Sequence, residues 1–359
     1  MEQQEAKKWF QKCIVLLVSL LGIIMMVMVV VDPYFHYHKP LDFMSYRLYE
    51  ERYINDGITR HFEYDAIITG TSMSQNFKPS EMDALFGTKS VKVPFSGAGF
   101  QELSQNLERA LARNKNIKTV IWTVDYNGLL REYDWKRYED YPTYLYDDNL
   151  LNDVSYLFNK SILYHGVLPN VVMSITGQPP TTMDEYSSWA YETGLEHIGL
   201  IYDRHNIGVE ENTEFGEEEY RVVETTIQNN FIQLINQYPD VDFYLFYTPY
   251  SICYWDVLDL KGTAMQQTEA ERVATELFLQ CPNVKLFNFF NQYDVVCNLN
   301  YYNDDGHYSA EINSRILSWM ADDVGRLTWE NYMERLEEER EFYLNYDYDA
   351  IYQELEADK

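Results

Sequence analysis

Residues 13–31 are the stretch that most limits how this chain can fold, because they are almost wholly apolar and carry no charge. As a helix rising about 1.5 Å per residue, the run is long enough to span the hydrocarbon core of a bilayer. Three lysines lie within residues 1–12, and Asp32 follows the run. Since positive charge is retained on the cytoplasmic side, the sequence predicts a cytoplasmic segment over 1–12 and an extracytoplasmic chain after Asp32.

A cleaved signal peptide is the competing interpretation of this run. The run is long for the apolar part of a signal peptide, and no small-x-small cleavage site follows it. We therefore expect a retained, single-pass transmembrane helix that holds the protein in the cell membrane.

The charge balance excludes one class of partner. Asp and Glu number 57 against 28 Lys and Arg, which gives a net charge of −29. Phosphates would repel such a chain, so we expect no nucleic acid partner. The same acidity makes the protein a poor surface for lying flat on anionic lipid.

The cysteines and histidines form no metal-binding pattern. Outside the apolar run the cysteines are Cys253, Cys281 and Cys297, an odd number without metal-like spacing. Free buried thiols are expected, and the sequence leaves open a bridge within one pair. His36 and His38 have no third ligand nearby, so we interpret them as a solvated pair. We expect no metal and no cofactor.

After residue 62 the sequence alternates between short apolar runs and helical patterns. The runs are rich in β-branched or aromatic residues and too short for helices, which predicts strands. The five predicted strands cover residues 66–68, 90–95, 117–124, 241–247 and 283–290. With helices between them, they predict an α/β fold, a three-layer sandwich with a mostly parallel five-stranded sheet.

The predicted α/β domain covers residues 63–328. The segments predicted around and within it are a stalk over 32–62, a less regular insertion over 129–216 and an acidic, partly helical tail over 329–359. An insertion such as 129–216, made largely of loops at the sheet edge, often determines substrate specificity. Three aromatic residues of the insertion, Trp189, Tyr191 and Tyr202, would either stack on a sugar or pack the insertion down.

A serine follows the first predicted strand, where the sequence reads Gly70-Thr71-Ser72. Thr71 or Ser72 could cap a following helix. A serine here would lie at the carboxyl edge of a parallel sheet, where open α/β folds bind ligands, and beside a helix N-terminus that favours negative charge. The plain alternative is that Ser72 is only a helix cap.

Three further motifs belong at the same sheet edge. Residues 96–99 (Ser-Gly-Ala-Gly) follow the second strand, and residues 125–128 (Asp-Tyr-Asn-Gly) follow the third. Asp304-x-x-His307 precedes the last predicted helix of the domain. An Asp three residues before a His can reach Nδ1, fix the tautomer and stabilise the imidazolium; Asp305 is the alternative partner. We expect the hydroxyl of Ser72 within about 3.5 Å of His307 Nε2.

In this order the motifs resemble the conserved blocks of the SGNH, or GDSL-like, hydrolase superfamily, which has a flavodoxin-like fold. The resemblance makes Ser72 the nucleophile of the first block. It makes the Gly97 N–H an oxyanion donor in the second block. Asp304 and His307 correspond to the acid and base of the last block.

The third block departs from the superfamily pattern. A Gly-x-Asn-Asp motif would fall on residues 123–126, which puts Asp125 in the place of the asparagine, with Asn127 two residues late. Which of Asp125 and Asn127 serves this block stays open. A carboxylate there would oppose an oxyanion.

With its single N-terminal anchor, the chain is similar to the extracytoplasmic branch of the superfamily. That branch includes the alginate and peptidoglycan O-acetylation factors and the teichoic acid D-alanyl transfer protein. The resemblance implies a serine esterase or O-acyltransferase acting on a cell-envelope polysaccharide or teichoic-acid-like polymer. It leaves room for a membrane-bound acyl carrier protein or acyltransferase as partner. The alternative is a non-catalytic binding or assembly factor that keeps the fold.

Overall fold

The computed structural model describes residues 2–138 and 141–357. The chain divides into two compact units. The first, here the N-terminal unit, comprises Met1–Phe62 and Asp140–Thr182, and the second, here the sheet unit, comprises Glu63–Glu139 and Met183–Lys359. The domain boundaries expected from the sequence stay predictions.

The N-terminal unit is helical. Its elements are α1 (Glu2–Val31), α2 (Glu51–His61), η3 (Thr143–Leu145), α5 (Val154–Leu157), α6 (Lys160–Ile162), the π-helical turn η4 (Leu163–Val167) and α7 (Leu168–Thr176). Within α1, residues Gln3–Val31 are long and apolar enough to cross a membrane. The direction of crossing stays a prediction.

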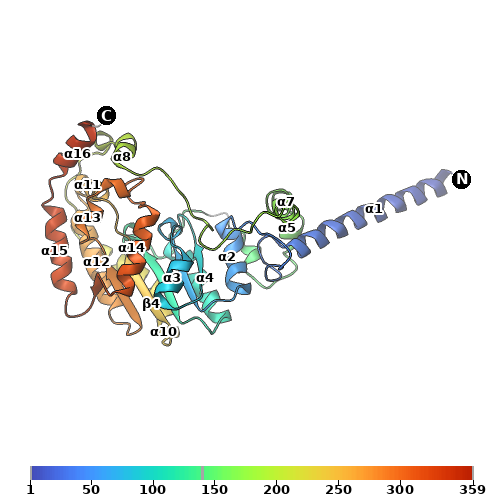
Figure 1. The fold of residues 1–359 in the computed structure, drawn as a ribbon, viewed down its shortest axis with the longest axis horizontal. Helices are drawn as coiled ribbons and strands as arrows, with labels where there is room; N and C mark the ends of the chain where they lie inside the picture. Colours follow the sequence, from blue (N-terminus) through green and yellow to red (C-terminus); the bar gives the residue numbers. More distant parts are fainter. Residues whose placement is uncertain (1, 139–140, 358–359) are drawn as a thin grey trace. The chain divides into compact units, whose positions relative to one another are not determined.

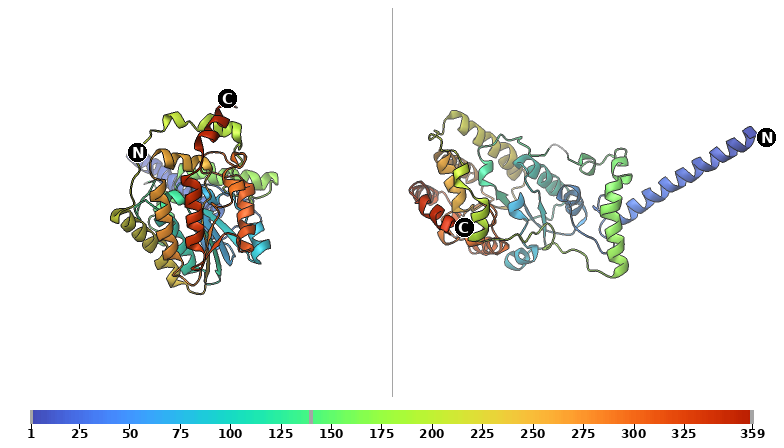
Figure 2. Two further views of the ribbon diagram at one scale, coloured as in Figure 1. Left: turned by 90° about the vertical axis from the view of Figure 1, so that its left-hand side faces the viewer. Right: turned by 90° about the horizontal axis from the view of Figure 1, so that it is seen from above.

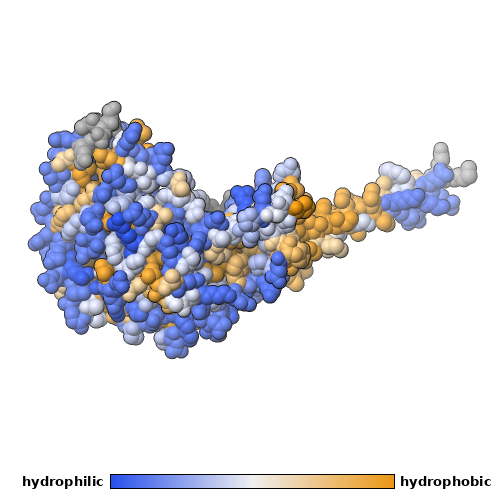
Figure 3. Space-filling view, in the orientation of Figure 1, coloured by the Kyte–Doolittle hydropathy of each residue, from blue (hydrophilic) through white to orange (hydrophobic). Residues whose placement is uncertain are grey.

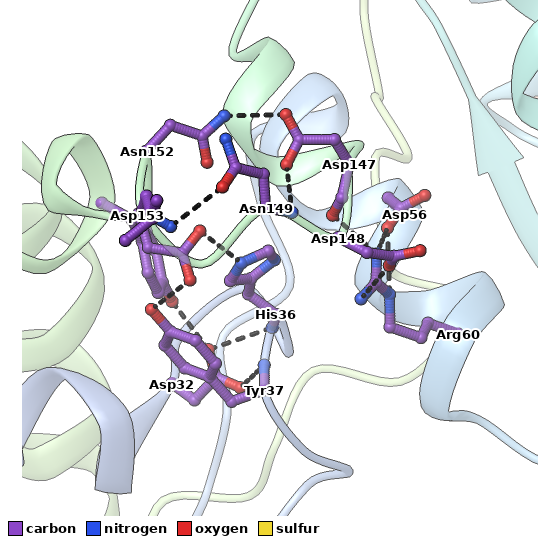
Figure 4. A network of polar contacts seen from close by, with 12 residues as sticks. Asp32, His36, Tyr37, Asp56, Arg60, Asp147, Asp148, Asn149, Asn152 and Asp153 are labelled. Carbon is purple, nitrogen blue, oxygen red and sulfur yellow. Dashed lines mark hydrogen bonds and ion pairs between the residues drawn. The ribbon is translucent and has the colours of Figure 1, made fainter.

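The interpretation of His36 as part of a solvated pair is wrong. The His36 side chain is only 5% exposed, and its Nε2 lies 3.1 Å from Asp153 Oδ1. Just after α1, the Asp32 carboxylate accepts the backbone N–H groups of His36, Tyr37 and His38. These contacts form a buried polar network at the end of α1 (Figure 4). The sequence could not predict this contact from local spacing, because Asp153 lies more than a hundred residues from His36 along the chain.

The sheet unit contains six strands. They are β1 (Ala66–Gly70), β2 (Ser90–Pro94), β3 (Thr119–Val124), β4 (Asp242–Tyr247), β5 (Val284–Asn288) and β6 (Arg326–Leu327), in the order β2-β1-β3-β4-β5-β6. All neighbouring pairs are parallel except β5 and β6. The predicted mixed α/β class is therefore confirmed, and the five-strand count is wrong. The missing strand has two residues, too few for any periodicity to reveal it.

Helices connect and follow these strands. Those that pack near the sheet are α3 (Pro79–Phe86), α4 (Phe100–Arg113), α9 (Glu217–Ile227), η6 (Gln228–Ile232), α10 (Gln233–Gln237), α12 (Ala264–Phe278) and α14 (Ala310–Ala321). The others are α8 (Leu195–Ile201), η5 (Arg204–Asn206), α11 (Ile252–Leu260), α13 (Tyr293–Val296), η7 (Leu299–Tyr301), α15 (Tyr332–Leu344) and α16 (Tyr348–Ala357). Short turns, η1 (Ser72–Ser74) and η2 (Tyr126–Gly128), follow β1 and β3.

The helices cover both faces of the sheet (Figures 1 and 2). On one face α3 packs against α14, and on the other α4, α9, η6 and α12 contact one another. The ring of Phe231, on η6, lies against Phe100 of α4, Trp122 of β3 and Phe278 of α12, so it joins three elements of that layer. With both faces covered, the strands are almost fully buried, and open α/β sheets of this kind bind ligands at the carboxyl edge.

The four cysteines are free thiols in the described chain, with Cys253 and Cys281 buried and Cys297 half-buried. The sequence left a bridge within one pair open, and the described chain contains none; Cys297 is less buried than expected. None of them lines the site described below.

Candidate active site

Ser72 lies directly beyond the carboxyl end of β1. The turn η1 begins at Ser72, and its N-cap is Thr71, whose Oγ1 accepts a hydrogen bond from the Met73 N–H at 3.4 Å. The Ser72 hydroxyl is therefore not used as the cap. Gly70 is required at the end of β1, because a Cβ there would lie 2.0 Å from Thr123 Oγ1 of β3. The close approach of β1 and β3 sets the turn that carries Ser72 at the sheet edge.

His307 and Asp304 complete a chain of hydrogen bonds that begins at Ser72. The distance from Ser72 Oγ to His307 Nε2 is 2.8 Å, within the limit expected for a nucleophile and its base. On the other side of the ring, His307 Nδ1 lies 2.8 Å from Asp304 Oδ2. Asp304 Oδ1 also accepts the backbone N–H groups of Gly306 and His307. Asp304 therefore both shapes the turn and orients the ring, and it is Asp304 rather than Asp305 that contacts Nδ1.

The turn that bears His307 is held by neighbouring elements of the sheet unit. Asn313 of α14 donates from Nδ2 to the Met73 carbonyl at 3.0 Å, which ties the helix after the histidine to the turn after the serine. The Ser251 hydroxyl donates to the Asp305 carbonyl at 2.9 Å. These two bonds join segments from three parts of the sequence and support the 2.8 Å contact between Ser72 and His307.

Carboxylates surround the histidine and shift its pKa. Burial lowers the pKa of His307, but Asp304, Asp125 and Asp305 together raise it above its ordinary value. Burial raises the pKa of Asp304, but the bond and charge of His307 outweigh it and lower the pKa overall. Asp305 has a raised pKa because of burial and the charge of Asp304. The histidine thus faces an environment that stabilises its protonated form, as a base needs when it accepts a proton.

Two backbone N–H groups at this cavity, those of Ser72 and Gly97, are candidate donors to a ligand. Ser72 begins a turn, where N–H groups have no partner within the helix. In the part of the chain that the structure describes, no acceptor is found for the N–H of Ser72 or of Gly97. Gly97 has φ of +65°, a left-handed conformation that other residues adopt only with strain. Both residues line one cavity.

Asp125 and Asn127, the two candidates for the third block, differ in their surroundings. Asn127 is exposed and lines the same cavity, so its side-chain amide is available to a ligand. Asp125 also lines the cavity, but its carboxylate is engaged: its Oδ2 accepts the Thr71 hydroxyl at 2.6 Å, and its Oδ1 is buried without a hydrogen-bond partner. Burial raises the pKa of Asp125 to about 6, against the opposing effects of Thr71 and the charge on His307. Near neutral pH the carboxyl is therefore close to the point where it gains or loses its proton.

The cavity at this edge has a volume of about 200 Å³ and contains residues that the sequence did not single out. Arg131, Glu132, Trp135 and Arg137 come from the segment after β3, and Tyr250 and Tyr254 follow β4. The guanidinium of Arg131 lies 4.1 Å from the ring centroid of Trp135. The only local signal for this pair was its spacing of four residues in an otherwise irregular segment.

The three candidate aromatic residues separate into two roles. Tyr202 is buried, and its hydroxyl donates to Asp256, so it packs the fold. Trp189 stacks on Tyr191 with ring centroids 4.9 Å apart, and its ring is nearly perpendicular to that of His307, with centroids 5.9 Å apart. Tyr191 is 64% exposed. A flat aromatic surface therefore lies next to the histidine.

No group of three or more metal-ligating side chains occurs among the described residues.

Comparisons with known proteins give no family assignment. No protein-family model matches the chain, and no curated protein matches it. Among solved structures, one from Streptococcus pneumonia, described provisionally as a platelet activating factor, is similar over 76% of this chain and 91% of that chain. The identity is 13% and the TM-score 0.39, a likeness too distant to support an argument about this protein's chemistry.

Proposed function

We propose that this protein is a membrane-anchored, extracytoplasmic serine esterase or O-acyltransferase of the SGNH type that acts on a cell-envelope polysaccharide or teichoic-acid-like polymer. The observation that carries the proposal is the chain of hydrogen bonds from Ser72 through His307 to Asp304 at the carboxyl edge of a mostly parallel sheet. Serine, histidine and aspartate in this order form a nucleophile, a base and a group that orients the base.

The first half of the reaction transfers an acyl group to Ser72. His307 Nε2 takes the hydroxyl proton as Oγ attacks the carbonyl carbon of an ester, and the resulting imidazolium is stabilised by Asp304. The N–H groups of Ser72 and Gly97 donate to the oxyanion. When the intermediate collapses, the ester C–O bond breaks, the imidazolium returns its proton to the leaving alcohol, and an acyl-serine remains.

The second half decides between esterase and transferase. His307 deprotonates a water molecule or a sugar hydroxyl, which attacks the acyl-serine and releases Ser72. The stacked Trp189 and Tyr191 beside His307 support a sugar acceptor, since aromatic faces pack well against the apolar faces of sugar rings. The membrane-spanning helix supports action at the cell surface, where a membrane-bound acyl carrier protein or acyltransferase would supply the acyl group.

One observation favours the alternative, a non-catalytic binding or assembly factor. Asp125 stands where the superfamily places an oxyanion donor, and an ionised carboxylate there disfavours negative charge in the cavity. Two arguments weigh against this alternative. The raised pKa of Asp125 keeps part of the population neutral near pH 6, and Asn127 offers a second amide donor at the cavity.

Labelling by an activated organophosphorus or aryl ester probe tests the proposal. Full-length protein in detergent or nanodiscs should become labelled on one serine, identified as Ser72 by peptide mass spectrometry. The Ser72→Ala variant should not be labelled. Ser188→Ala, which removes an exposed serine of the same unit, is the matched control and should be labelled like the parent.

Two results would contradict the assignment. Labelling of another serine in the parent, with Ser72 unmodified, would show that Ser72 is not the nucleophile. Absence of labelling in a folded parent that still binds a cell-envelope polymer would favour the binding factor instead.

A further inference from the structure

The outward face of one helical segment in the N-terminal unit is apolar. The segment, here the surface helix, covers residues 150–176 and contains α5, α6, η4 and α7. Its exposed apolar side chains are Leu150, Leu151, Val154, Phe158, Tyr164, Leu168, Val172 and Ile175. Leu151 is 89% exposed and Ile175 80%. Protein surfaces that face water rarely gather so many large apolar side chains on one segment.

The polarity of α7 is inverted relative to that of an ordinary surface helix. Its inward face carries Asn170, which is fully buried and accepts the Arg47 N–H at 2.9 Å. Ser174, also on that side, accepts the Ser45 N–H at 2.9 Å. The outward residues recur every three or four positions and are Tyr164 of η4 followed by Leu168, Val172 and Ile175 of α7. Since a helix at a protein–water boundary shows the reverse pattern, the outward face meets an apolar medium.

The surface helix contains one acidic residue, Asp153, which is buried and exposes no charge. No Asp or Glu occurs over residues 154–183, although the whole chain contains 57 acidic residues among 359. This is the longest acid-free run in the sequence, and the next longest is residues 6–31, within α1. Lys160 and His165 are exposed on the surface helix. This surface therefore departs from the general expectation that so acidic a chain is repelled by anionic lipid.

Polar contacts fix the surface helix to the end of α1. The Tyr156 hydroxyl of α5 donates to Asp32 Oδ1 at 2.8 Å, one residue beyond α1. Asp153 pairs with His36 at 3.1 Å in the same network (Figure 4). α1 also contacts α5 and η4 directly. The buried network therefore holds the surface helix where α1 ends.

The direction of α7 is that of a helix lying on a bilayer. Figure 2 shows α7 running across the end of α1 instead of continuing along it. If α1 spans the membrane, a helix that crosses its end lies along the membrane surface. In Figure 3 the apolar surface of α1 extends to the region where α1 meets the rest of its unit.

We propose that the surface helix is an interfacial membrane helix, with the eight apolar side chains inserted at the boundary between lipid headgroups and acyl chains. Amphipathic helices bind this boundary through their apolar face, and basic side chains add attraction to anionic lipid. The proposal is independent of any catalytic activity and rests on α1 as the membrane-spanning element. The protein then has two membrane contacts, one across the bilayer and one along it.

Nitroxide accessibility in nanodiscs tests the proposal on the full chain. Single spin labels are placed at Leu151→Cys and Ile175→Cys, and the signal of identically treated parent protein is subtracted to remove the native thiols. Thr143→Cys, an exposed polar position of the same unit, is the aqueous control, and Leu21→Cys in α1 is the membrane control. We measure relaxation by oxygen, which concentrates in lipid, and by a water-soluble nickel chelate.

The labels at 151 and 175 should show an oxygen-to-nickel accessibility ratio severalfold above that at 143 and closer to that at 21. A ratio equal to that at 143, with position 21 in lipid, would overturn the proposal, because the apolar face would then meet water. Labels shielded from both reagents would overturn it in favour of contact with a second copy. A label at 21 accessible to nickel would show that α1 itself does not span the bilayer, which would overturn the membrane-anchored part of the proposed function as well.

Discussion

The histidine–carboxylate pairs His307–Asp304 and His36–Asp153, one in each unit, differ in what surrounds them. His307 lies 2.8 Å from Asp304 through Nδ1 and 2.8 Å from the Ser72 hydroxyl through Nε2, at the wall of a cavity. His36 lies 3.1 Å from Asp153 through Nε2, and both side chains are almost fully buried. The pairs have similar lengths and the same two residue types.

The difference teaches that the pair itself does not define a catalytic site. In the His307 pair, the second ring nitrogen faces a hydroxyl that a ligand in the cavity can reach. In the His36 pair, the carboxylate also accepts the Tyr37 hydroxyl at 3.0 Å, and the whole network supports the end of α1 (Figure 4). We therefore expect changes at the first pair to alter rate, and changes at the second to alter stability.

The largest expected effect is the loss of the nucleophile or the base. Ser72→Ala and His307→Ala should each lower kcat for an aryl ester by at least about four orders of magnitude, and the double variant should lose no more than either single variant, because the two residues act as a unit. Steady-state hydrolysis measures the rates, and circular dichroism checks the fold. If the losses multiply in the double variant, Ser72 and His307 do not work in one step.

Asp304→Asn should have the next largest effect, a loss of about two to three orders of magnitude in kcat with KM little changed. The amide cannot stabilise the imidazolium and can hold the wrong tautomer; in the serine protease template this change costs about four orders. The Asp304 side chain is 33% exposed, so solvent screens the attraction between its charge and the imidazolium. The expected loss of rate is therefore smaller than in the template. Asp305→Asn and Asp153→Asn, measured with the same ester, should cost much less. A greater loss in Asp305→Asn would reverse the assignment of the partner.

The pH dependence of kcat/KM should distinguish His307 from His36. The expected shift is smaller than the losses of rate above. A base must be unprotonated, and the neighbouring carboxylates raise the pKa of His307, so kcat/KM should fall with decreasing pH through a value above the ordinary 6.5. Asp304→Asn should move this acidic limb of the profile, the fall of kcat/KM at low pH, to lower pH. The variant removes the main group that raises the pKa of His307. Asp153→Asn should leave the limb in place. A limb that does not move in Asp304→Asn would mean that another group titrates.

The smallest effect on rate, and the clearest on stability, is expected at the buried pair. Asp153→Asn replaces a buried acceptor of two hydrogen bonds with a weaker one, at a cost of about 1–3 kcal/mol. The thermal unfolding midpoint of the full-length protein in detergent should fall, while ester turnover at low temperature stays near that of the parent. An unchanged midpoint with reduced turnover would mean that this pair supports the site and not the fold.

Much of the sheet unit was predictable because its signals are local. Five strands lie where short β-branched and aromatic runs occur, and the sixth was missed because two residues carry no period. The Asp304–His307 contact was predictable because it spans three positions on one turn. In each case the physical cause lies within a few residues of the observed feature.

Other parts of the candidate site depend on contacts between distant segments. Thr71 meets Asp125 across 54 positions, and Ser72 meets His307 across 235. Which of Trp189, Tyr191 and Tyr202 would be buried was also undecided in the sequence, because that depends on what packs on each ring. The arginines of the cavity had no signal beyond their presence in an irregular segment.

The sequence by itself determined the apolar helix, the mixed α/β class and the order of the motifs, since periodicity and spacing act over short distances. Only the tertiary structure decided which histidine lies at the cavity and which is buried, and which face of the surface helix points outward. The reason is that burial and exposure are properties of the packed chain: Asn170 is inside and Ile175 outside on the same short helix. No local pattern assigns those faces until the segments at Ser45 and Arg47 pack against one of them.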